Sequence, residues 1–388
     1  MKGQKEVSYS LVATTTAYGN VRTVLPSSAK AHNVSEFEQL AGSVMVCGFP
    51  GVEAPPEIRS WLTDDSVAGL ILFKRNIDDV QQITELITSC TTTEDPSLPI
   101  LFCVDQEGGR VARFGDPIVK LPAMRKLAEA ADPELTTSAG TVLARQLRAL
   151  GINLDFAPVL DVDTNPRNPV IGDRAFGSTS EAVIEHALAF ADGLHAGGVL
   201  SCGKHFPGHG DTDLDTHLAL PTLQHDRERL EQVELRPFRA AVGRLPSIMT
   251  AHVIFDAFDS VPATISHRVI EELLRTDIGY DGVVFTDDLE MKAVSALYPI
   301  EESGLLAIEA GCDILLICSD VEAAGRLREA LAREADRHQA FRKRLEEARS
   351  RADTLRRRVT TLPPPMRLEN ALSHVEARTL AERLQRLG

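Results

Sequence analysis

The chain has 388 residues, of which 43% are hydrophobic and 25% charged, an ordinary composition for a soluble globular protein with a large core. Its formal net charge of −15 argues against a nucleic-acid-binding surface and gives no reason for attraction to an anionic membrane. No apolar run approaches the roughly 20 residues that a membrane-spanning helix needs.

The N-terminal region has no continuous apolar stretch before a cleavage site, so a signal peptide is not expected. Residues 1–35 are rich in Thr, Ser and Ala without a stable period, which predicts a weakly ordered arm. The six cysteines are scattered, and most lie in or beside apolar runs. This usage indicates buried free thiols in a reducing compartment, so we expect a cytoplasmic protein.

From residue 44 onward one pattern repeats: a short apolar run, a polar loop and a segment with helical periodicity. Most runs are apolar on both faces, which is typical of strands in a parallel sheet. The eight runs cover residues 44–48, 67–73, 100–104, 152–157, 199–202, 248–251, 283–286 and 314–318.

The intervening segments carry helix signals. Asp132 is placed to cap a helix whose first residue is Pro133, and Gly151 ends its apolar stripe. The short segment between the first two runs, residues 55–65, predicts a stunted helix. Further helices are predicted from residue 76, from residue 180 to the glycines at 197–198, and over residues 226–243, 266–276, 300–310 and 320–333.

Eight strands alternating with helices predict an α/β fold, a (β/α)₈ TIM-like barrel over residues 36–335. A doubly wound sheet is less favoured because no Gly-x-Gly-x-x-Gly follows the first strand. Residues 336–388 contain charged helix formers interrupted by Pro363–Pro365, which predicts a C-terminal helical extension packed on the barrel or on a partner. Its basic run is typical of a solvated helix face.

Polar side chains cluster where the predicted strands end, which is where barrel enzymes place functional groups. The densest stretch, Cys202–His217, follows the fifth run. It contains Lys204, His205, His209, Asp211, Asp213, Asp215 and His217. Other strand ends contribute residues 105–110, Asp161, His252 and the pair Asp287–Asp288.

These residue types suit glycoside hydrolysis, which needs a nucleophile below the sugar and a proton donor beside the leaving oxygen. Asp287 is a candidate nucleophile, although the alternation of the strand does not choose between Asp287 and Asp288. His217 is a candidate proton donor, because Asp215 lies two residues away and a carboxylate can fix the tautomer of an imidazole. The ordinary histidine pKa of about 6.5 suits a group that donates and then accepts a proton.

Three motifs carry a family resemblance: the stretch from Lys204 to His217, Asp105–Arg110 and Thr286–Leu289. Together they resemble the N-acetyl-β-glucosaminidases of glycoside hydrolase family 3, most of all the bacterial peptidoglycan-recycling type, over roughly residues 40–335. The resemblance implies a retaining exo-enzyme in which Asp287 forms a covalent glycosyl-enzyme. His217 would be the acid/base, with Asp215 as its partner.

The same resemblance implies a substrate-binding set of Asp105, Arg113, Arg174, Lys204 and His205. The implied substrate is a muropeptide fragment with a terminal N-acetylglucosamine, and neither a cofactor nor a metal is expected. Nothing suggests a nucleic-acid or membrane partner. The oligomeric state stays open, with a monomer as the working expectation.

The remaining strand-end residues receive structural expectations. We expect His209 and Asp211 to hold the shape of their loop, and Glu107 and Arg110 to form a buried network. His252 is equally compatible with a structural role and a substrate contact. We further hypothesise that Gly208 and Gly210 make the loop flexible enough for His217 to swing toward the nucleophile.

Three rival interpretations remain open. A metallohydrolase on the same barrel would use His205, His209, Asp211 and His217 as ligands. A family 3 β-glucosidase or other exo-glycosidase would often take its proton donor from a second domain, for which little sequence follows residue 335. A catalytically inactive barrel would only bind sugar or a partner, but the nucleophile and acid/base positions are occupied by suitable residues.

Overall fold

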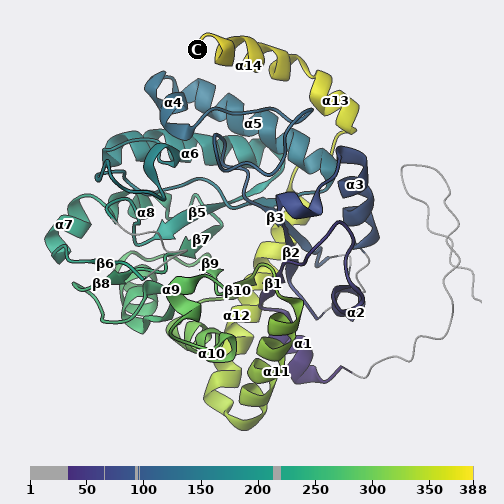
Figure 1. Ribbon diagram of the computed structural model, residues 1–388, viewed down its shortest axis with the longest axis vertical. Coiled ribbons are helices and arrows are strands. Elements are labelled where there is room, and N and C mark those ends of the chain that lie inside the picture. Colours follow the sequence, from purple (N-terminus) through teal and green to yellow (C-terminus); the bar gives the residue numbers. More distant parts are fainter. Residues whose placement is uncertain (1–33, 65, 92–94, 96, 213–219, 388) are drawn as a thin grey trace, which may run out of the picture. The chain divides into compact units, whose positions relative to one another are not determined.

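Within the residues that the computed structural model describes (34–64, 66–91, 95, 97–212 and 220–387), eight parallel strands close into a barrel (Figure 1). The order around the barrel is β1-β10-β9-β7-β5-β4-β3-β2, and every neighbouring pair is parallel. The strands are β1 (Met45–Cys47), β2 (Gly69–Leu72), β3 (Leu101–Val104), β4 (Leu154–Asp155), β5 (Leu200–Phe206), β7 (Ser247–Thr250), β9 (Val283–Asp288) and β10 (Ile314–Ile317). Each coincides with one of the eight predicted runs, and the TIM-like barrel is confirmed.

The inside of the barrel is filled by alternate residues of its strands. Leu200 and Cys202 of β5 belong to this interior cluster, as do Val283 and Phe285 of β9. The ring of Phe285 packs edge-on against that of Phe156, with the ring centroids 5.3 Å apart. Because side chains of a strand alternate between its faces, the next inward positions on β5 and β9 are residues 204 and 287. The apolar interior therefore ends in a layer of charged side chains.

Helices surround the barrel, as predicted (Figure 1). They are α1 (Glu36–Gly42), α2 (Pro56–Thr63), α3 (Val80–Ser89), α4 (Met124–Glu129), α5 (Pro133–Leu150), α6 (Ser180–Gly197), α7 (Arg227–Gln232), α8 (Arg236–Ala241), α9 (Lys292–Ser295), α10 (Ile300–Ala310) and α11 (Val321–Arg337). Residues 268–277 form a π-helical segment, and short 3₁₀ turns cover residues 74–76, 172–174, 263–265 and 359–361.

Helix α5 has the ends that the sequence predicts. The Asp132 side chain accepts a hydrogen bond from the Leu135 backbone N–H at 3.0 Å, and Gly151 ends the helix with a φ of +102°.

One predicted helix is wrong: residues 226–243 form two helices, α7 and α8. Pro237 lies in the first turn of α8, where its missing N–H costs little, whereas inside a continuous helix it would break the hydrogen-bond ladder.

Two short strands were not predicted: β6 (Thr222–Leu223) pairs in parallel with β8 (Ile254–Phe255), outside the barrel. Each spans only two residues, too short to give an alternating pattern. In the described part of the chain, none of the helices combines the length and apolar composition needed to cross a bilayer.

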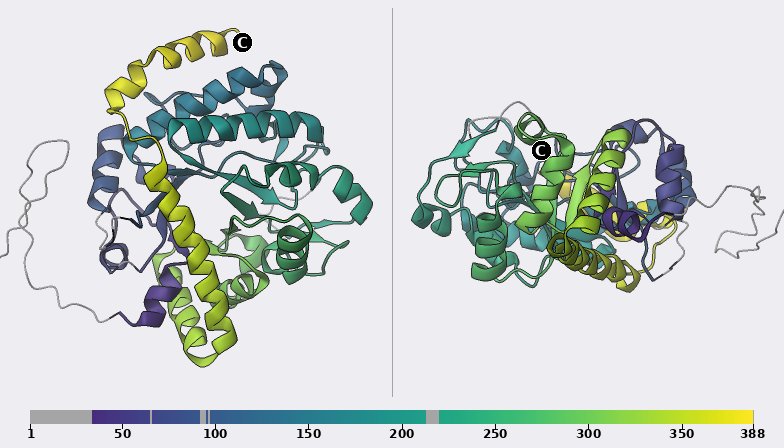
Figure 2. Two further views of the ribbon diagram at one scale, coloured as in Figure 1. Left: turned by 180° about the vertical axis from the view of Figure 1, so that it is seen from behind. Right: turned by 90° about the horizontal axis from the view of Figure 1, so that it is seen from below.

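The C-terminal segment contains α12 (Gln339–Arg358), α13 (Leu368–Ser373) and α14 (Val375–Gln385), and it belongs to the same compact unit as the barrel. Helix α12 runs across the back of the molecule, behind the strands (Figure 2, left). Its residues Ala352 and Leu355, with Val359 just beyond, join the apolar cluster of the barrel interior. Helix α12 therefore closes the end of the barrel opposite the charged layer.

A buried carboxylate fastens α12 to the barrel. Asp313, just before β10, accepts hydrogen bonds from Arg344 at 2.9 Å and Arg351 at 3.2 Å, both on α12, and from Arg275. The same carboxylate accepts the Val284 backbone N–H of β9 at 3.0 Å. Since a buried carboxylate requires such partners, the arginines of α12 are part of the fold as well as of a solvated face.

The packing of α12 predicts the effect of a single truncation. Leu355→Ala should lower the free energy of unfolding by about 2–5 kcal/mol, because it leaves a cavity at the closed end of the barrel. Leu297→Ala, at a side chain that is 57% exposed, is the matched control and should change stability by no more than about 0.5 kcal/mol. Chemical denaturation measures both, and equal effects would contradict the role given to α12.

Candidate functional site

A cavity of about 330 Å³ lies at the carboxyl end of the barrel strands. Among its lining residues are Phe73, Asp105, Glu107, Arg110, Arg113, Arg174, Lys204, His205, His209, Asp287, Asp288, Met291 and Cys318. The cavity thus brings together every predicted substrate-binding residue and the predicted nucleophile. A second hollow of about 360 Å³, between α1 and α12, is lined by none of them.

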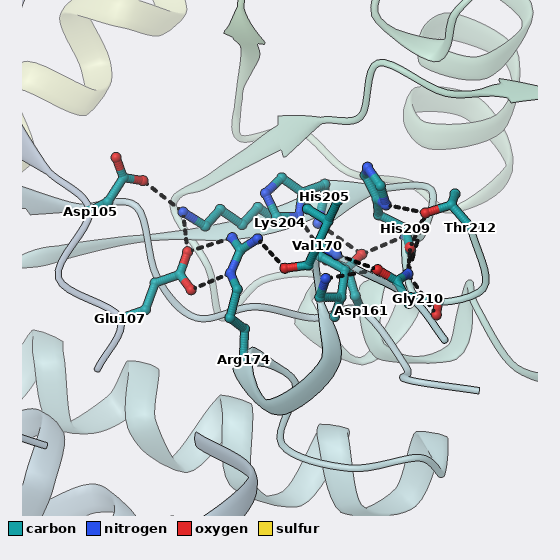
Figure 3. Close-up of polar contacts among 12 residues, drawn as sticks. Asp105, Glu107, Asp161, Val170, Arg174, Lys204, His205, His209, Gly210 and Thr212 are labelled. Carbon is teal, nitrogen blue, oxygen red and sulfur yellow. Dashed lines mark hydrogen bonds and ion pairs between the residues drawn. The ribbon is translucent and has the colours of Figure 1, made fainter. Parts of the chain in front are cut away.

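Four side chains form a buried charge network in the cavity wall (Figure 3). The Lys204 ammonium lies 2.7 Å from an Asp105 oxygen and 2.6 Å from a Glu107 oxygen. Arg174 binds Glu107 through two parallel hydrogen bonds, each of 2.8 Å. The network joins strand β5, the loop after β3 and the 3₁₀ turn at residues 172–174, so it fixes three strand-end segments relative to one another.

The residues of this network stay ionised despite their burial, because each lies beside a group of opposite charge. Burial alone would raise the pKa of Asp105, but the nearby Lys204 and Arg113 charges outweigh it and hold the pKa below its ordinary value. Burial likewise opposes ionisation of Glu107, whose pKa is nevertheless lowered by Arg174 and Lys204. For Lys204, burial favours the neutral amine, yet the two carboxylates raise its pKa above the ordinary value. All three groups are therefore charged at neutral pH.

The predicted sugar ligand His205 is oriented by a carboxylate that had no predicted role. Its Nδ1 lies 2.7 Å from an oxygen of the buried Asp161, whose other oxygen accepts the backbone N–H groups of His205 and His209. Burial opposes ionisation of Asp161, but the two histidines lower its pKa overall. Because an ionised carboxylate only accepts, His205 carries its proton on Nδ1 and keeps Nε2 for a ligand.

His209 and Asn168 hold the segment that follows β5. The His209 Nδ1 lies 2.8 Å from the Thr212 hydroxyl, and the Asn168 amide donates to the carbonyls of His209 and Gly210 at 2.8 and 3.0 Å. Asp211 pairs with His225. These contacts confirm the loop-shaping roles predicted for His209 and Asp211. Burial and the neighbouring His205 lower the pKa of His209 to about 4, so this imidazole is neutral at pH 7.

The structure gives Gly208 and Gly210 a packing role, whereas the flexibility predicted for them concerns a movement of His217, which lies outside the described residues. Both residues are buried. A Cβ on Gly210 would lie 1.8 Å from the carbonyl oxygen of Val162, and one on Gly208 would lie 2.9 Å from the Glu234 side chain. Glycine is required there because the backbone approaches its neighbours closely, and at Gly208 also because φ is +131°.

Asp287 and Asp288 both line the cavity but differ in ionisation. Burial raises the pKa of Asp287, but the histidines 252 and 205 and the Asp288 backbone N–H more than offset it, so the pKa lies below its ordinary value. The pKa of Asp288 rises to about 7, chiefly through burial, with the negative charges of Glu290 and Asp287 adding to it. The alternation from Val283 and Phe285 also places Asp287 with the inward residues. Both observations favour Asp287 as the anion.

The two arginines of the loop after β3 have different surroundings. The Arg113 guanidinium lies 3.0 Å from Asp105 and packs over the Phe73 ring, 5.2 Å from its centroid. The Arg110 side chain is 48% exposed and binds Asp173 and the carbonyl of Ile171. Glu107 belongs to a buried network as predicted, whereas for Arg110 that prediction is wrong.

His252 lies beside the nucleophile candidate without lining the cavity. It is completely buried, its Nδ1 lies 2.8 Å from the Thr264 hydroxyl, and its Nε2 lies 2.9 Å from the Asp288 carbonyl oxygen. Since a carbonyl oxygen only accepts, Nε2 carries a proton. These contacts favour the structural alternative for His252, with an electrostatic effect on Asp287.

Two predicted catalytic residues, Asp215 and His217, lie outside the described residues, as does Asp213. Among the described residues, no group of three or more His, Cys, Asp or Glu side chains is placed to hold a metal ion. The metal alternative named His217, so the described residues do not contain its complete ligand set. All six cysteines are free and buried, as predicted.

Two residues behind the cavity wall, Gln106 and Asp155, were given no role from the sequence. Gln106 is buried between Asp105 and Glu107, and its side chain forms hydrogen bonds with backbone groups of residues 113 and 114. Asp155 ends β4, and its carboxylate accepts the Gln106 backbone N–H at 2.9 Å. A carboxylate inside an apolar strand was the available signal, because buried charges need a specific reason to be there.

Comparisons with known proteins agree on one family. The family model described as "Glycosyl hydrolase family 3 N terminal domain" matches residues 36–362. A beta-hexosaminidase of Alkalilimnicola ehrlichii is 42% identical over 291 residues, which cover 73% of this chain and 82% of the relative. The structure of a glycoside hydrolase family 3 beta-N-acetylglucosaminidase from Paenibacillus superposes with a TM-score of 0.83 at 39% identity, covering 90% of this chain and 68% of that one.

A second similar structure contains a sugar. NagZ from Neisseria gonorrhoeae, in complex with N-trifluoroacetyl-D-glucosamine, has a TM-score of 0.75 and 32% identity to this chain. The match covers 89% of this chain and 98% of the Neisseria protein.

The buried Asp155 predicts a pH-dependent stability. Burial raises its pKa from the ordinary 3.8 to about 7, so between these values the unfolded chain releases a proton that the folded protein retains. The wild type should therefore lose stability relative to Asp155→Asn as the pH rises from 4 to 7, by an amount on the order of a few kcal/mol, and the gap should level off above 7.

Denaturation curves at several pH values measure this gap. Asp116→Asn, at a side chain that is 83% exposed, is the control and should show no comparable change with pH. A stability difference between Asp155→Asn and wild type that stays constant from pH 4 to 8 would contradict the assignment of a buried, un-ionised acid.

Proposed function

Because this chain belongs to glycosyl hydrolase family 3 and is a glycoside hydrolase, we propose that it is a retaining exo-β-N-acetylglucosaminidase. One observation carries the proposal: the anionic Asp287 shares one cavity with the Asp105–Lys204–Glu107–Arg174 charge network. A nucleophile beside groups that can bind sugar hydroxyls is the arrangement that cleavage of a terminal sugar requires. The names of the similar proteins support N-acetylglucosamine as that sugar.

In the proposed mechanism, Asp287 supplies the nucleophile. One carboxylate oxygen attacks the anomeric carbon as the bond from that carbon to the leaving oxygen breaks, which forms a glycosyl-enzyme ester. The low pKa of Asp287 supports this role, because only the ionised carboxylate attacks. His217, oriented by Asp215, would protonate the leaving oxygen. It would then remove a proton from the water that releases the sugar and regenerates the Asp287 carboxylate.

Five residues would bind the hydroxyl groups of one sugar. Asp105 would accept hydrogen bonds, whereas Lys204, Arg113, Arg174 and the Nε2 nitrogen of His205 would contact the sugar oxygens. The existing ion pairs support preorganisation, because they hold these groups in place before a sugar arrives. Arg174 already donates to Glu107 and to the Val170 carbonyl, so its share in sugar binding should be the smallest of the five.

The biological substrate that we propose is a peptidoglycan fragment, a muropeptide with a terminal N-acetylglucosamine. This extension places the enzyme in the cytoplasm, in cell-wall recycling, and it needs neither a metal nor a second macromolecule. The similarity to NagZ supports it. Hydrolysis of a purified muropeptide to free N-acetylglucosamine is the direct assay, and cleavage of simple aryl glycosides without muropeptide turnover would contradict the recycling role.

Substitution of the two adjacent aspartates tests the catalytic assignment. Asp287→Asn should lower kcat by about a thousandfold or more while the fold is retained, because the amide is not a nucleophile. Asp288→Asn, the matched control, should lower kcat at least about tenfold less than Asp287→Asn does, because Asp288, with a pKa of about 7, is already about half protonated at pH 7. His217→Ala should lower kcat and flatten its dependence on pH.

The assay substrate is 4-nitrophenyl N-acetyl-β-glucosaminide, compared with the corresponding β-glucoside. A preference for the glucoside would favour the β-glucosidase alternative, and loss of activity on exhaustive chelation would favour the metallohydrolase. Normal turnover by both Asp287→Asn and His217→Ala would overturn the proposed mechanism.

A further inference from the structure

Gln106 lies between two residues of the charge network, yet its side chain directs its hydrogen bonds to the backbone of the loop after β3. Its Oε1 accepts the N–H groups of Arg113 at 2.7 Å and Phe114 at 3.0 Å, and its amide donates to the Phe114 carbonyl at 3.2 Å. The residue is 2% exposed. One side chain therefore closes the loop from residue 106 back onto residues 113 and 114.

The loop closed by Gln106 carries Asp105 and Arg113 at its two ends. Their side chains meet at 3.0 Å in the cavity wall. Because the backbone N–H of Arg113 is bound by Gln106, the position from which the guanidinium extends is set by that glutamine. Phe73 packs on the guanidinium, at the other end of the same side chain.

Asp155 fastens the closed loop to the barrel. Strand β3 ends at Val104, and beyond it the Gln106 N–H is bound by the Asp155 side chain at 2.9 Å. Asn153, two residues earlier on the same side of its strand, binds the Phe102 N–H of β3 in the same way, at 2.8 Å. Asn153 and Asp155 thus hold β3 at Phe102 and the loop after it at Gln106.

We propose that Gln106 and Asp155 are positioning residues that hold Asp105 and Arg113 in the geometry needed to bind the sugar. That the bound ligand is a sugar rests on the proposed function, whereas the anchoring of the loop rests on the hydrogen bonds described above. Neither residue touches the substrate. Without Gln106, the N–H groups of residues 113 and 114 lose their acceptor inside the protein, and the loop must rearrange to satisfy them.

Substitutions at residue 106 test the positioning role. Gln106→Met removes the donor and the acceptor at nearly constant volume, and it should raise KM for 4-nitrophenyl N-acetyl-β-glucosaminide by roughly tenfold or more, with kcat changed by less than about threefold. Gln106→Glu keeps the acceptor oxygens and should restore part of the lost affinity. Similarly, Asp155→Leu should raise KM. Asp155→Asn retains an acceptor for the Gln106 N–H, so its KM should stay much closer to that of the wild type.

Hydrogen exchange followed by mass spectrometry provides a readout that does not depend on activity. Gln106→Met should speed exchange of the amides at residues 113 and 114. Gln146→Met is the matched control, because Gln146 is also buried and its side chain accepts the Val119 N–H at 2.7 Å away from the cavity. It should speed exchange at Val119 alone and leave KM unchanged.

Unchanged exchange at residues 113 and 114 in Gln106→Met would overturn the anchor. Faster exchange with KM within about twofold of wild type would overturn its role in substrate binding. If the wild-type enzyme did not hydrolyse the glucosaminide, the proposed function would fail, while the exchange data would still decide whether Gln106 and Asp155 hold the loop.

Discussion

Lys204 is 2% exposed, and its ammonium group stays charged there because Asp105 and Glu107 lie within hydrogen-bonding distance. Glu107 in turn is satisfied by Arg174. Removing one partner of such a buried set typically costs about 3–5 kcal/mol, because the remaining charge is left uncompensated. The strand end, loop and turn that carry these four residues must therefore meet at the end of the barrel, and the cavity wall is assembled before any ligand enters.

The same constraint explains why the barrel has two different ends. At the carboxyl end of the strands, charged side chains face a cavity, whereas at the opposite end Leu355 and its neighbours on α12 continue the apolar interior. Asp313 binds its arginines at this closed end. Charge at one end is available to a substrate, and charge at the other joins the last long helix to the strands.

Much of the fold could be predicted because its strands are buried on both faces and its helices have distinct ends. The eight apolar runs form the eight barrel strands, and α5 begins after Asp132 and ends at Gly151 as expected. The failures arose where tertiary contacts outweigh local pattern. Pro237 begins a new helix within a segment that has helical periodicity throughout, and β6 and β8 are too short to have a pattern of their own.

The site was predictable in its residues but not in its connections. Motif and strand-end position indicated Asp287, Lys204 and His205, all of which line the cavity. The pairing of Asp161 with His205 spans 44 residues and that of Asp155 with Gln106 spans 49, and a single sequence does not record which distant residues meet. The packing role of Gly210 was missed for a similar reason: the carbonyl of Val162, which excludes a side chain there, is invisible in the sequence.

Trapping the covalent intermediate tests the role of Asp287 as nucleophile most directly. The enzyme would be incubated with a fluorinated β-N-acetylglucosaminyl donor whose glycosyl-enzyme hydrolyses slowly, then digested and analysed by mass spectrometry. We expect one added sugar, on the peptide that contains Asp287, and none in Asp287→Asn. An adduct on another residue, or turnover that inverts the anomeric centre without any adduct, would contradict it.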